Sequence, residues 1–287
     1  MKRFNKIAII GVGLIGGSIG LAARTRKVAK EVIGVFRHRS TMRRALKFKA
    51  VDTGVMDMGE GIEDADLIIL ATPVHSIPVL AAETAVFAKK GAIITDAGST
   101  KEWIVGKAQA ALRRHPSISF VGSHPMAGSE RTGVEFATRD LFEGSPCIVT
   151  KTAKTDKRSL AKVAAFWKAL GGKVKVMSPA EHDRTVSLVS HLPHVVAFSL
   201  AGAVPGKEME CAAEGFKDTT RVASSDPDLW ADIFLTNKKA LLAAGRMFDT
   251  YYARVMKAIA GGNYFQTVKM LKSAKAKRDR FIYGKKT

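Results

Sequence analysis

The chain has very little cysteine. Among its 287 residues only Cys147 and Cys211 occur, far apart and in no spacing typical of metal ligands. This usage excludes a disulfide framework, indicates no zinc site and fits a reducing cytoplasm. Beyond residues 1–23, no apolar run reaches the length of a membrane span without a glycine or a charge. There is no internal repeat. With 46% hydrophobic residues, we expect a folded, cytoplasmic protein with an ample apolar core.

Acidic residues are also few. The sequence has 46 Lys and Arg against 26 Asp and Glu, a formal net charge of +20, and its basic residues gather at 37–49 and 269–286. Such a charge implies anionic partners. The basic runs lack interleaved aromatic residues and match no standard nucleic-acid module, which favours small anionic ligands over nucleic acid. A non-catalytic protein that senses dinucleotides or binds nucleic acid stays open as an alternative.

What the chain does have, near its beginning, is the pattern of a strand, a glycine turn and a helix. The apolar run 7–10 precedes Gly-x-Gly-x-x-Gly, and apolar residues 19–23 follow. The glycines permit a tight turn and the close approach of a pyrophosphate, which the N–H groups and dipole of the helix N-terminus stabilise. We therefore predict cofactor contacts at Gly11, Gly13, Leu14, Ile15 and Gly16.

The same stretch also resembles a secretory signal peptide, because Met1-Lys2-Arg3 precedes mostly apolar residues up to Ala23. A second strand, expected at 31–36, follows where a βαβ unit needs it. Cleavage would remove the central strand of that unit. We therefore favour the dinucleotide-binding interpretation.

Strand and helix then alternate as far as residue 177. We expect strands at 31–36, 67–71, 91–95, 118–121, 147–150 and 173–177, and helices at 42–49, 75–88, 102–114 and 157–170. This alternation is typical of one parallel sheet covered on both faces, with ligands at the carboxyl ends of its strands. From Ser178 the period becomes helical, with segments expected at 179–203, 228–259 and 263–280.

We therefore predict an α/β fold, with a Rossmann-type dinucleotide-binding domain at 1–178 and an all-helical domain at 179–287. The apolar faces of the helical domain exceed what a small cap needs for itself, so some of them are expected to cover a partner subunit. We expect a homodimer formed through this dimerisation domain. Within it, Asp226-Pro227 is interpreted as the start of a helix.

The residues after the second strand favour NADP over NAD, although NAD stays possible. An NAD site places an acid about twenty residues past the glycines, where it binds the ribose 2′-hydroxyl, and no acid is present here. Basic and hydroxyl side chains in its place can bind a 2′-phosphate. The cofactor contacts predicted in this part of the chain are Arg37, His38, Arg39, Ser40 and, at the end of the next strand, Thr72 and Pro73.

Five stretches together resemble one family. They are the glycine turn, Asp96-Ala97-Gly98-Ser99-Thr100-Lys101, Ser123-His124-Pro125-Met126-Ala127-Gly128, Ser190-His191-Leu192-Pro193-His194 and Gly215-Phe216-Lys217-Asp218-Thr219-Thr220-Arg221. Over essentially its whole length the chain resembles the prephenate and arogenate dehydrogenases of tyrosine biosynthesis. The resemblance implies oxidative decarboxylation of a cyclohexadienol, with hydride passing to the nicotinamide cofactor. Because the resemblance covers nearly all 287 residues, we expect no fused chorismate mutase and no regulatory ACT domain in this chain.

The same resemblance implies roles for individual residues. His124 is the catalytic histidine, a residue type whose pKa near neutrality suits withdrawal of a hydroxyl proton. Ser99 hydrogen-bonds the same hydroxyl, and it could also cap the helix that follows. Arg221 binds the substrate carboxylate, for which a planar guanidinium is the natural bidentate partner. Further substrate contacts are implied at His191, His194, Ser129 and Glu130.

No metal site is predicted. His191 and His194 lie three residues apart, but only His182 and Asp183 are near them and there is no cysteine. The resemblance implies instead that these two histidines belong to the substrate pocket.

The substrate is expected to be prephenate rather than arogenate. Prephenate is a dianion, whereas arogenate carries an additional ammonium, which would need an acid in a pocket built from Arg221 and two histidines. Glu130 is the only acid next to a motif that could serve. NADP use favours arogenate instead, since the two often occur together in this family. A hydroxy-acid dehydrogenase of the Rossmann-plus-helical type, acting on an aliphatic substrate, is a further alternative.

Overall fold

The structure is a computed structural model that describes residues 3–128 and 131–284. The chain divides into two compact units, Met1–Lys238 and Lys239–Thr287, and each is described by itself.

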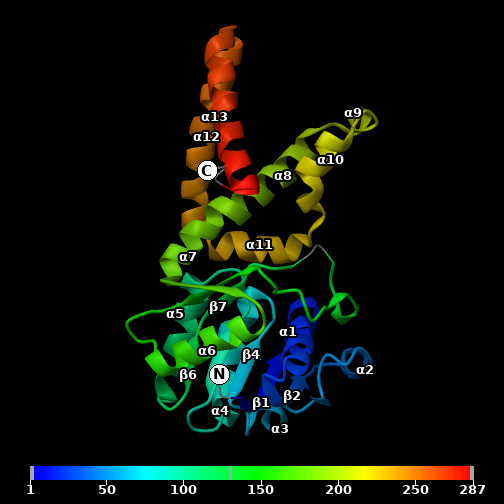
Figure 1. The fold of residues 1–287 in the computed structure, drawn as a ribbon, viewed down its shortest axis with the longest axis vertical. Coiled ribbons are helices and arrows are strands. Elements are labelled where there is room, and N and C mark those ends of the chain that lie inside the picture. Colours follow the sequence, from blue (N-terminus) through cyan, green and yellow to red (C-terminus); the bar gives the residue numbers. More distant parts are fainter. Residues whose placement is uncertain (1–2, 129–130, 285–287) are drawn as a thin grey trace. The chain divides into compact units, whose positions relative to one another are not determined.

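A six-stranded parallel sheet forms the centre of the first unit (Figure 1). Its strands are β1 (Phe4–Ile10), β2 (Ala29–Val35), β3 (Thr53–Val55), β4 (Leu67–Leu70), β5 (Ile93–Asp96) and β6 (Ser119–Val121). The order β3-β2-β1-β4-β5-β6 is that of a doubly wound dinucleotide-binding sheet. The helices between these strands are α1 (Leu14–Thr25), α2 (Arg39–Lys47), α3 (Met58–Ile62), α4 (Ile77–Phe87) and α5 (Glu102–Ala111).

The central strand β1 shows why both faces of the sheet are covered. Ile7 and Ile9 belong to one apolar cluster, while Ala8 and Ile10 belong to a second one. Successive side chains of a strand point to opposite faces, so the apolar stretch Ile7–Ile10 must be buried on both sides. The predicted Rossmann-type fold is confirmed, with β3 and α3 as short elements that the sequence pattern did not reveal.

Three further strands form a separate sheet, contrary to the single sheet expected from the sequence. Its order is β7 (Ser123–Pro125), β8 (Pro146–Thr150) and β9 (Lys173–Met177), with β7 antiparallel to β8 and α6 (Lys157–Ala169) between the last two. The chain leaves the main sheet at Gly122, where a Cβ would lie 2.6 Å from the hydroxyl of Thr150. Gly122 is the single residue between β6 and β7, and its lack of a side chain allows the backbone to pass close to Thr150.

A long helical stretch follows the second sheet. It consists of α7 (Pro179–Val186), a π-helical turn (Ser187–His191) and α8 (Leu192–Ala203). The hydroxyl of Ser178 accepts the N–H of Glu181 and so caps the helix, with proline in its first turn. π-Helical turns occur frequently at functional sites, and this one ends at His191.

The remaining helices of the first unit are short. They are α9 (Gly206–Met209), α10 (Glu214–Thr220), a 3₁₀ turn (Arg221–Ser224) and α11 (Pro227–Thr236). The carboxylate of Asp226 accepts two backbone N–H groups at the start of α11, as expected for a helix start. The first unit extends to Lys238 because α7 packs on α5, and α11 packs on the 3₁₀ turn Val74–Ser76.

One helical stretch of the described residues is long and apolar enough to cross a membrane, by length and composition alone. The stretch Pro179–Ala203 has a mean hydropathy of 1.4 over 18 residues and is long enough to span a membrane. The stretch is interrupted by three charged residues at 181–184 and by Gly202, as expected from the sequence. Of its most apolar 18-residue window 22% is buried, and the stretch carries His182, Asp183 and His191, which are almost completely buried in polar contacts.

The second unit contains two helices, α12 (Lys238–Ala260) and α13 (Tyr264–Tyr283). They are joined by a tight turn in which Gly262 has φ +60° and the side chain of Asn263 caps α13. The hydroxyl of Tyr251 donates to the carbonyl of Met270 across the pair, at 3.3 Å. Several large apolar side chains of this unit are exposed, among them Met247, Tyr252, Met256, Ile259, Phe265 and Leu271.

Candidate active site

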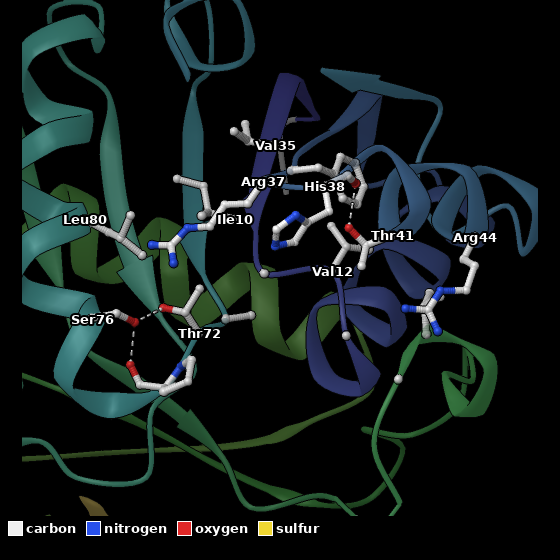
Figure 2. A pocket seen from close by; sticks show the side chains of 17 residues that line it. Ile10, Val12, Val35, Arg37, His38, Thr41, Arg44, Thr72, Ser76 and Leu80 are labelled. Atoms are coloured by element: carbon white, nitrogen blue, oxygen red, sulfur yellow. Dashed lines mark hydrogen bonds between the residues drawn. The ribbon is translucent and has the colours of Figure 1, made fainter. Parts of the chain in front are cut away.

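A cavity of about 390 Å³ lies at the carboxyl ends of β1, β2 and β4 (Figure 2). Four segments line it: the glycine turn, the end of β2 with α2, the loop after β4, and a short stretch around Gly133. No acidic residue is among its described lining residues, which are Ile10, Gly11, Val12, Gly13, Val35, Phe36, Arg37, His38, Thr41, Arg44, Ala71, Thr72, Pro73, Ser76, Leu80, Gly133 and Val134.

The glycine turn fits a pyrophosphate. Gly11 has φ +91° and a Cβ there would lie 2.4 Å from the carbonyl of Ala71, while a Cβ on Gly16 would lie 2.2 Å from the carbonyl of Gly11. These two glycines are therefore required by the turn itself. A Cβ on Gly13 would meet no protein atom within 4 Å, although Gly13 lines the cavity at the N-terminus of α1. The open space beside Gly13 is where an anionic group can reach the helix N-terminus.

The predicted cofactor residues divide into two groups. Those that line the cavity are Gly11, Gly13, Arg37, His38, Thr72 and Pro73. Those that do not line it, and lie instead in the first turns of α1 and α2, are Leu14, Ile15, Gly16, Arg39 and Ser40. The side chain of Arg37 extends across the cavity toward Leu80 in Figure 2.

Sequence reasoning missed Arg44 and Ser76 in the cavity wall. Arg44 lies one helical turn after Thr41 on α2, and its guanidinium is 3.6 Å from the carboxylate of Glu135. The hydroxyl of Ser76 donates to the carbonyl of Pro73 at 2.7 Å and lies 2.9 Å from the hydroxyl of Thr72. For Arg44 a signal existed, because residues three apart share one face of a helix.

Beyond the cavity, a network of buried polar side chains lies at the ends of β5 and β7. Asp96 and Lys101 are completely buried and form an ion pair. The carboxylate of Asp96 also accepts the N–H groups of Gly98, at 2.9 Å, and Ser123, at 3.0 Å. Burial raises the pKa of Asp96, although Lys101 opposes this. The carboxylate therefore ties together the two loops that carry Ser99 and His124.

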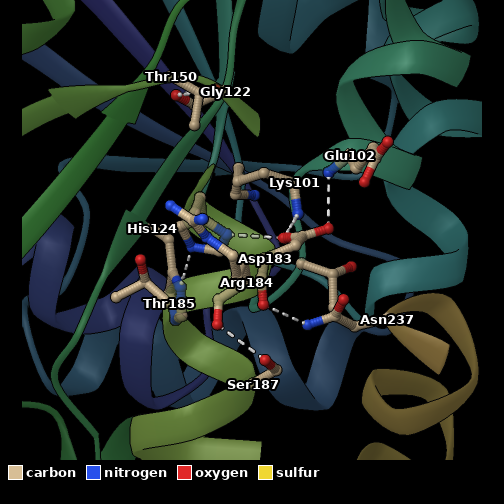
Figure 3. Close-up of polar contacts among 12 residues, drawn as sticks. Lys101, Glu102, Gly122, His124, Thr150, Asp183, Arg184, Thr185, Ser187 and Asn237 are labelled. Carbon is tan, nitrogen blue, oxygen red and sulfur yellow. Dashed lines mark hydrogen bonds and ion pairs between the residues drawn. The ribbon is translucent and has the colours of Figure 1, made fainter. Parts of the chain in front are cut away.

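His124 is connected through this network to helix α7 (Figure 3). Its Nδ1 lies 2.8 Å from Nε2 of His182, and Nδ1 of His182 lies 2.7 Å from Oδ1 of Asp183. The carboxylate of Asp183 also accepts the backbone N–H groups of Lys101, at 2.7 Å, and Glu102, at 2.9 Å. The helix α5 is thus capped by Asp183 rather than by Ser99, whose side chain is half-buried.

The same aspartate contacts a second histidine indirectly. Nδ2 of Asn237, at the C-terminus of α11, donates to the backbone carbonyl of Asp183 at 2.9 Å and lies 3.1 Å from Nδ1 of His191. Nε2 of His191 is buried and has no hydrogen-bond partner among residues 3–128 and 131–284. A buried polar atom of this kind is a site where a ligand can bind.

His194 and Arg221 lie on the outer side of this region. The imidazole of His194 stacks on Trp230 with ring centroids 3.5 Å apart, and Trp230 also meets His191 edge-on at 6.0 Å. Burial lowers the pKa of His194, and the nearby charge of Arg221 contributes to the shift. Three of the predicted substrate residues, His191, His194 and Arg221, are thus brought to one region.

Burial keeps the histidines of the network neutral. It lowers the pKa of His124 well below the usual value, with the charges of His182, Lys101 and His191 adding to the effect. It lowers the pKa of His182 to about 2 and that of His191 to about 4. A neutral imidazole can accept a proton, so His124 is competent as a base at neutral pH.

Two predicted substrate residues, Ser129 and Glu130, lie outside the described residues. In the described part of the chain no group of three or more His, Cys, Asp or Glu side chains could hold a metal ion. Sequence reasoning missed His182, Asp183 and Asn237 as parts of the site. It also assigned only a structural role to the segment that contains Trp230.

A doubly wound sheet with a glycine turn beneath a cavity, and a buried neutral histidine beyond it, defines an NAD(P)-dependent dehydrogenase. The family models described as prephenate dehydrogenase, nucleotide-binding domain, and prephenate dehydrogenase, dimerization domain, match residues 19–176 and 178–273. The chain belongs to the prephenate dehydrogenase family.

Individual relatives agree with this assignment. Cyclohexadienyl dehydrogenase of Zymomonas mobilis is 37% identical over 275 residues, covering 92% of each chain. Prephenate dehydrogenase from A. aeolicus, solved in complex with hydroxyphenyl propionate and NAD+, has a TM-score of 0.89 and 32% identity over 96% of this chain and 98% of that one. Synechocystis arogenate dehydrogenase has a TM-score of 0.82 and 29% identity over 96% and 100%. The chain spans 65% and 66% of two longer prephenate dehydrogenases.

Proposed function

We propose that the protein catalyses the NADP-dependent oxidative decarboxylation of prephenate to 4-hydroxyphenylpyruvate. The observation that carries this proposal is the buried, neutral His124 on β7, directly after β6 of the sheet that bears the glycine-turn cavity. Residues 1–178 would bind the cofactor, and residues 179–287 would bind the substrate and form the dimer. The test is to mix the purified protein with prephenate and NADP and to follow reduced nicotinamide and the phenolic product. Absence of turnover with prephenate and with arogenate would contradict the assignment.

The chain's own residues supply the proton chemistry and the positioning. When bound, the nicotinamide accepts a hydride from the ring carbon that carries the hydroxyl. His124 takes the hydroxyl proton, and Ser99 orients that hydroxyl. Carbon dioxide leaves with cleavage of its bond to the ring, and the ring becomes aromatic. Arg221 and His191 hold the carboxylates of the substrate, and His194, on α8, contributes to the same pocket.

NADP is preferred in this proposal because of the charges around the cavity. Arg37, His38 and Arg44 line it, and no acid among its described lining residues is available to a ribose 2′-hydroxyl. A 2′-phosphate adds negative charge that basic side chains stabilise. We expect kcat/KM to be higher with NADP than with NAD, and the opposite ratio would overturn the preference.

Arogenate is the second candidate substrate, and one observation favours it. Nδ1 of His194 lies 2.9 Å from the carbonyl of Ser190 and therefore donates to it, which leaves Nε2 of a neutral His194 as an acceptor for an ammonium. Prephenate stays the first choice because Arg221 lies near this histidine and favours the more anionic ligand. Competition of the two substrates for one enzyme decides the question. A preference for arogenate that Glu130→Gln abolishes would identify the acid responsible.

The protein is proposed to be a cytoplasmic homodimer. The exposed apolar side chains of α12 and α13, such as Met247, Ile259 and Phe265, are more than 60%, 50% and 80% exposed, respectively. Such a surface indicates burial against another protein surface. Sedimentation equilibrium should give twice the chain mass, and a monomer at all accessible concentrations would contradict the proposal.

A further inference from the structure

Two histidines of the site differ in which ring nitrogen can carry a proton, and one residue, Asp183, contacts the partners of both. We infer that Asp183 is a positioning residue that fixes His124 and His191 in opposite tautomers. His124 presents a bare Nε2 that accepts the substrate's hydroxyl proton, and His191 presents an Nε2–H that donates to a substrate oxygen. This inference rests on the proposed function for the identity of the ligand, but the tautomers follow from the protein alone.

The first tautomer follows from the side chain of Asp183. Its two oxygens accept the N–H groups of Lys101 and Glu102 at the start of α5, where a carboxylate is stabilised by the helix dipole. A carboxylate can only accept hydrogen bonds, so Nδ1 of His182 must carry the proton in the 2.7 Å contact. Nε2 of neutral His182 is then an acceptor. Nδ1–H of His124 donates to it at 2.8 Å, and Nε2 of His124 is left without a proton.

The second tautomer follows from the backbone of Asp183. Its carbonyl can only accept, so the atom of Asn237 at 2.9 Å is the amide nitrogen, and the orientation of that amide is fixed. The second hydrogen of the same nitrogen points to Nδ1 of His191, at 3.1 Å. Nδ1 of His191 is therefore the acceptor and its Nε2 carries the proton. This is the buried atom without a partner among the described residues.

The burial of these groups makes the arrangement persistent. His182, Asp183 and His191 are at most 1% exposed, and Asn237 is 4% exposed. A buried donor that faces another donor costs free energy, so the alternative tautomers are disfavoured. Burial also lowers the pKa values of all three histidines, which keeps one proton on each ring. Each ring thus has a single favoured proton position.

The direct test is the protonation state of each ring nitrogen in the unsubstituted protein. The seven histidines are labelled with nitrogen-15, and long-range proton–nitrogen correlation spectra at neutral pH distinguish a protonated from a bare ring nitrogen. Single histidine substitutions assign the signals. We expect bare Nε2 on His124 and His182, and bare Nδ1 on His191. The reverse pattern on His124 or on His191 would overturn the inference, whatever substrate the enzyme uses.

Kinetic variants test whether the tautomers matter. In His182→Gln the amide oxygen can still accept from His124, whereas His182→Leu has no acceptor. We expect His182→Leu to lower kcat about 10–100-fold with little change in substrate KM, and His182→Gln to retain most of kcat. His115→Leu, outside the network, is the matched control. Equal losses in the Gln and Leu variants would show that His182 only fills space.

A substitution of Asn237 tests the tautomer of His191. In Asn237→Asp a carboxylate accepts from Nδ1 of His191, which moves the proton away from Nε2. We expect substrate KM to rise at least about tenfold, as for the loss of a hydrogen bond to a charged group, with a smaller effect on kcat. An unchanged KM in a folded variant whose spectra show the reversed tautomer would overturn the role of His191 as a donor. A complete lack of turnover by the unsubstituted protein would instead contradict the proposed function.

Discussion

The cofactor cavity lies at the carboxyl ends of β1, β2 and β4, whereas the buried histidine network joins the end of β5 to β7 and α7, and the two are built differently. Backbone groups, buried apolar side chains such as Val35 and Leu80, and the exposed side chains of Arg37 and His38 form the cavity. The network consists of side chains that are almost completely buried, and each of them is held by others. The cavity can therefore vary in specificity at low cost, whereas a change in the network affects stability and chemistry together.

We expect the largest loss of turnover from a substitution of His124, the residue of the network that accepts the substrate's proton. His124→Asn keeps a polar side chain of smaller size but removes the base, so kcat should fall by about 10²–10⁴-fold. Cofactor affinity should remain, because His124 does not line the cofactor cavity. The measurement is steady-state turnover, with thermal denaturation as the control for folding. A loss of less than about tenfold would remove His124 from its catalytic role.

Substitutions of two glycines in the same turn, Gly11 and Gly13, are expected to affect different properties: protein stability and cofactor binding, respectively. Gly11→Ala puts a Cβ 2.4 Å from a backbone carbonyl at φ +91°, and should cost about 3 kcal/mol of stability. Gly13→Ala meets no protein atom, so its stability should change by less than about 0.5 kcal/mol. Its Cβ projects into the cavity, however, and the Kd for the cofactor should rise about tenfold. Thermal denaturation and cofactor titration of both variants test this difference, and similar behaviour of the two would contradict it.

Local sequence signals predicted the sheet and the glycine turn of the cavity but not the network. The glycine spacing and the alternation of strand and helix depend on residues close together in the chain, and both predicted the Rossmann-type sheet correctly. The contact between His124 and His182 joins residues 58 positions apart, and the cap of α5 by Asp183 joins residues 81 and 82 apart. No local pattern encodes such pairs. From the sequence alone we therefore consider His182 and Asp183 only as possible metal ligands, and we predict no metal site.

The same limit explains the finer differences between the sequence-based expectations and the structure. Arg39 and Ser40 follow Arg37 and His38 in sequence, but they lie in the first turn of α2 and do not line the cavity, so their part in cofactor binding stays a prediction. Arg44 enters that wall from a later turn of the same helix. The strand β7 is too short to be recognised by its pattern, and it forms a sheet with strands that follow much later. Helix phase and tertiary pairing decide these details.

Arg221 is expected to affect substrate binding rather than the chemical step. Arg221→Ala removes a charge-assisted contact, so the substrate KM should rise about 10–100-fold while the KM for the cofactor hardly changes. Arg221 is exposed, so the fold should be kept. Arg131→Ala, which also removes one positive charge, is the matched control for general electrostatics. A normal substrate KM in Arg221→Ala would exclude Arg221 from carboxylate binding.

The network should also make the protein sensitive to acid. Burial lowers the pKa values of His182 and His191 to about 2 and about 4, below the unfolded value of 6.5. The unfolded chain therefore binds more protons, and the stability that depends on neutral histidine is lost as the pH falls below 6.5. Each histidine contributes at most about 1.4 kcal/mol per pH unit. The raised pKa of Asp183 acts with the opposite sign, so variants must be compared with the parent.

Denaturant unfolding between neutral pH and about pH 5 measures this dependence, in the range where unfolded histidine takes up its proton. His182→Gln should show a shallower loss of stability than the parent protein, because the side chain no longer titrates. His115→Gln, outside the network, should follow the parent. An unchanged slope in His182→Gln would mean that His182 does not contribute to the acid sensitivity.

The smallest change in activity is expected from a substitution at the rim of the cavity. Arg37 and Arg39 lie two positions apart there, so one can serve as the matched control for the other. Arg37 lines the cavity, whereas Arg39 does not, and both side chains are exposed. Because solvent and salt screen exposed charges, Arg37→Ala should lower the NADP-to-NAD ratio of kcat/KM by only about five- to tenfold. Arg39→Ala removes the same charge and should leave the ratio nearly unchanged, while raising the salt concentration should reduce the preference of the parent protein toward that of Arg37→Ala. If the two substitutions lower the ratio equally, the preference depends on the overall positive charge of this region and not on a contact made by Arg37.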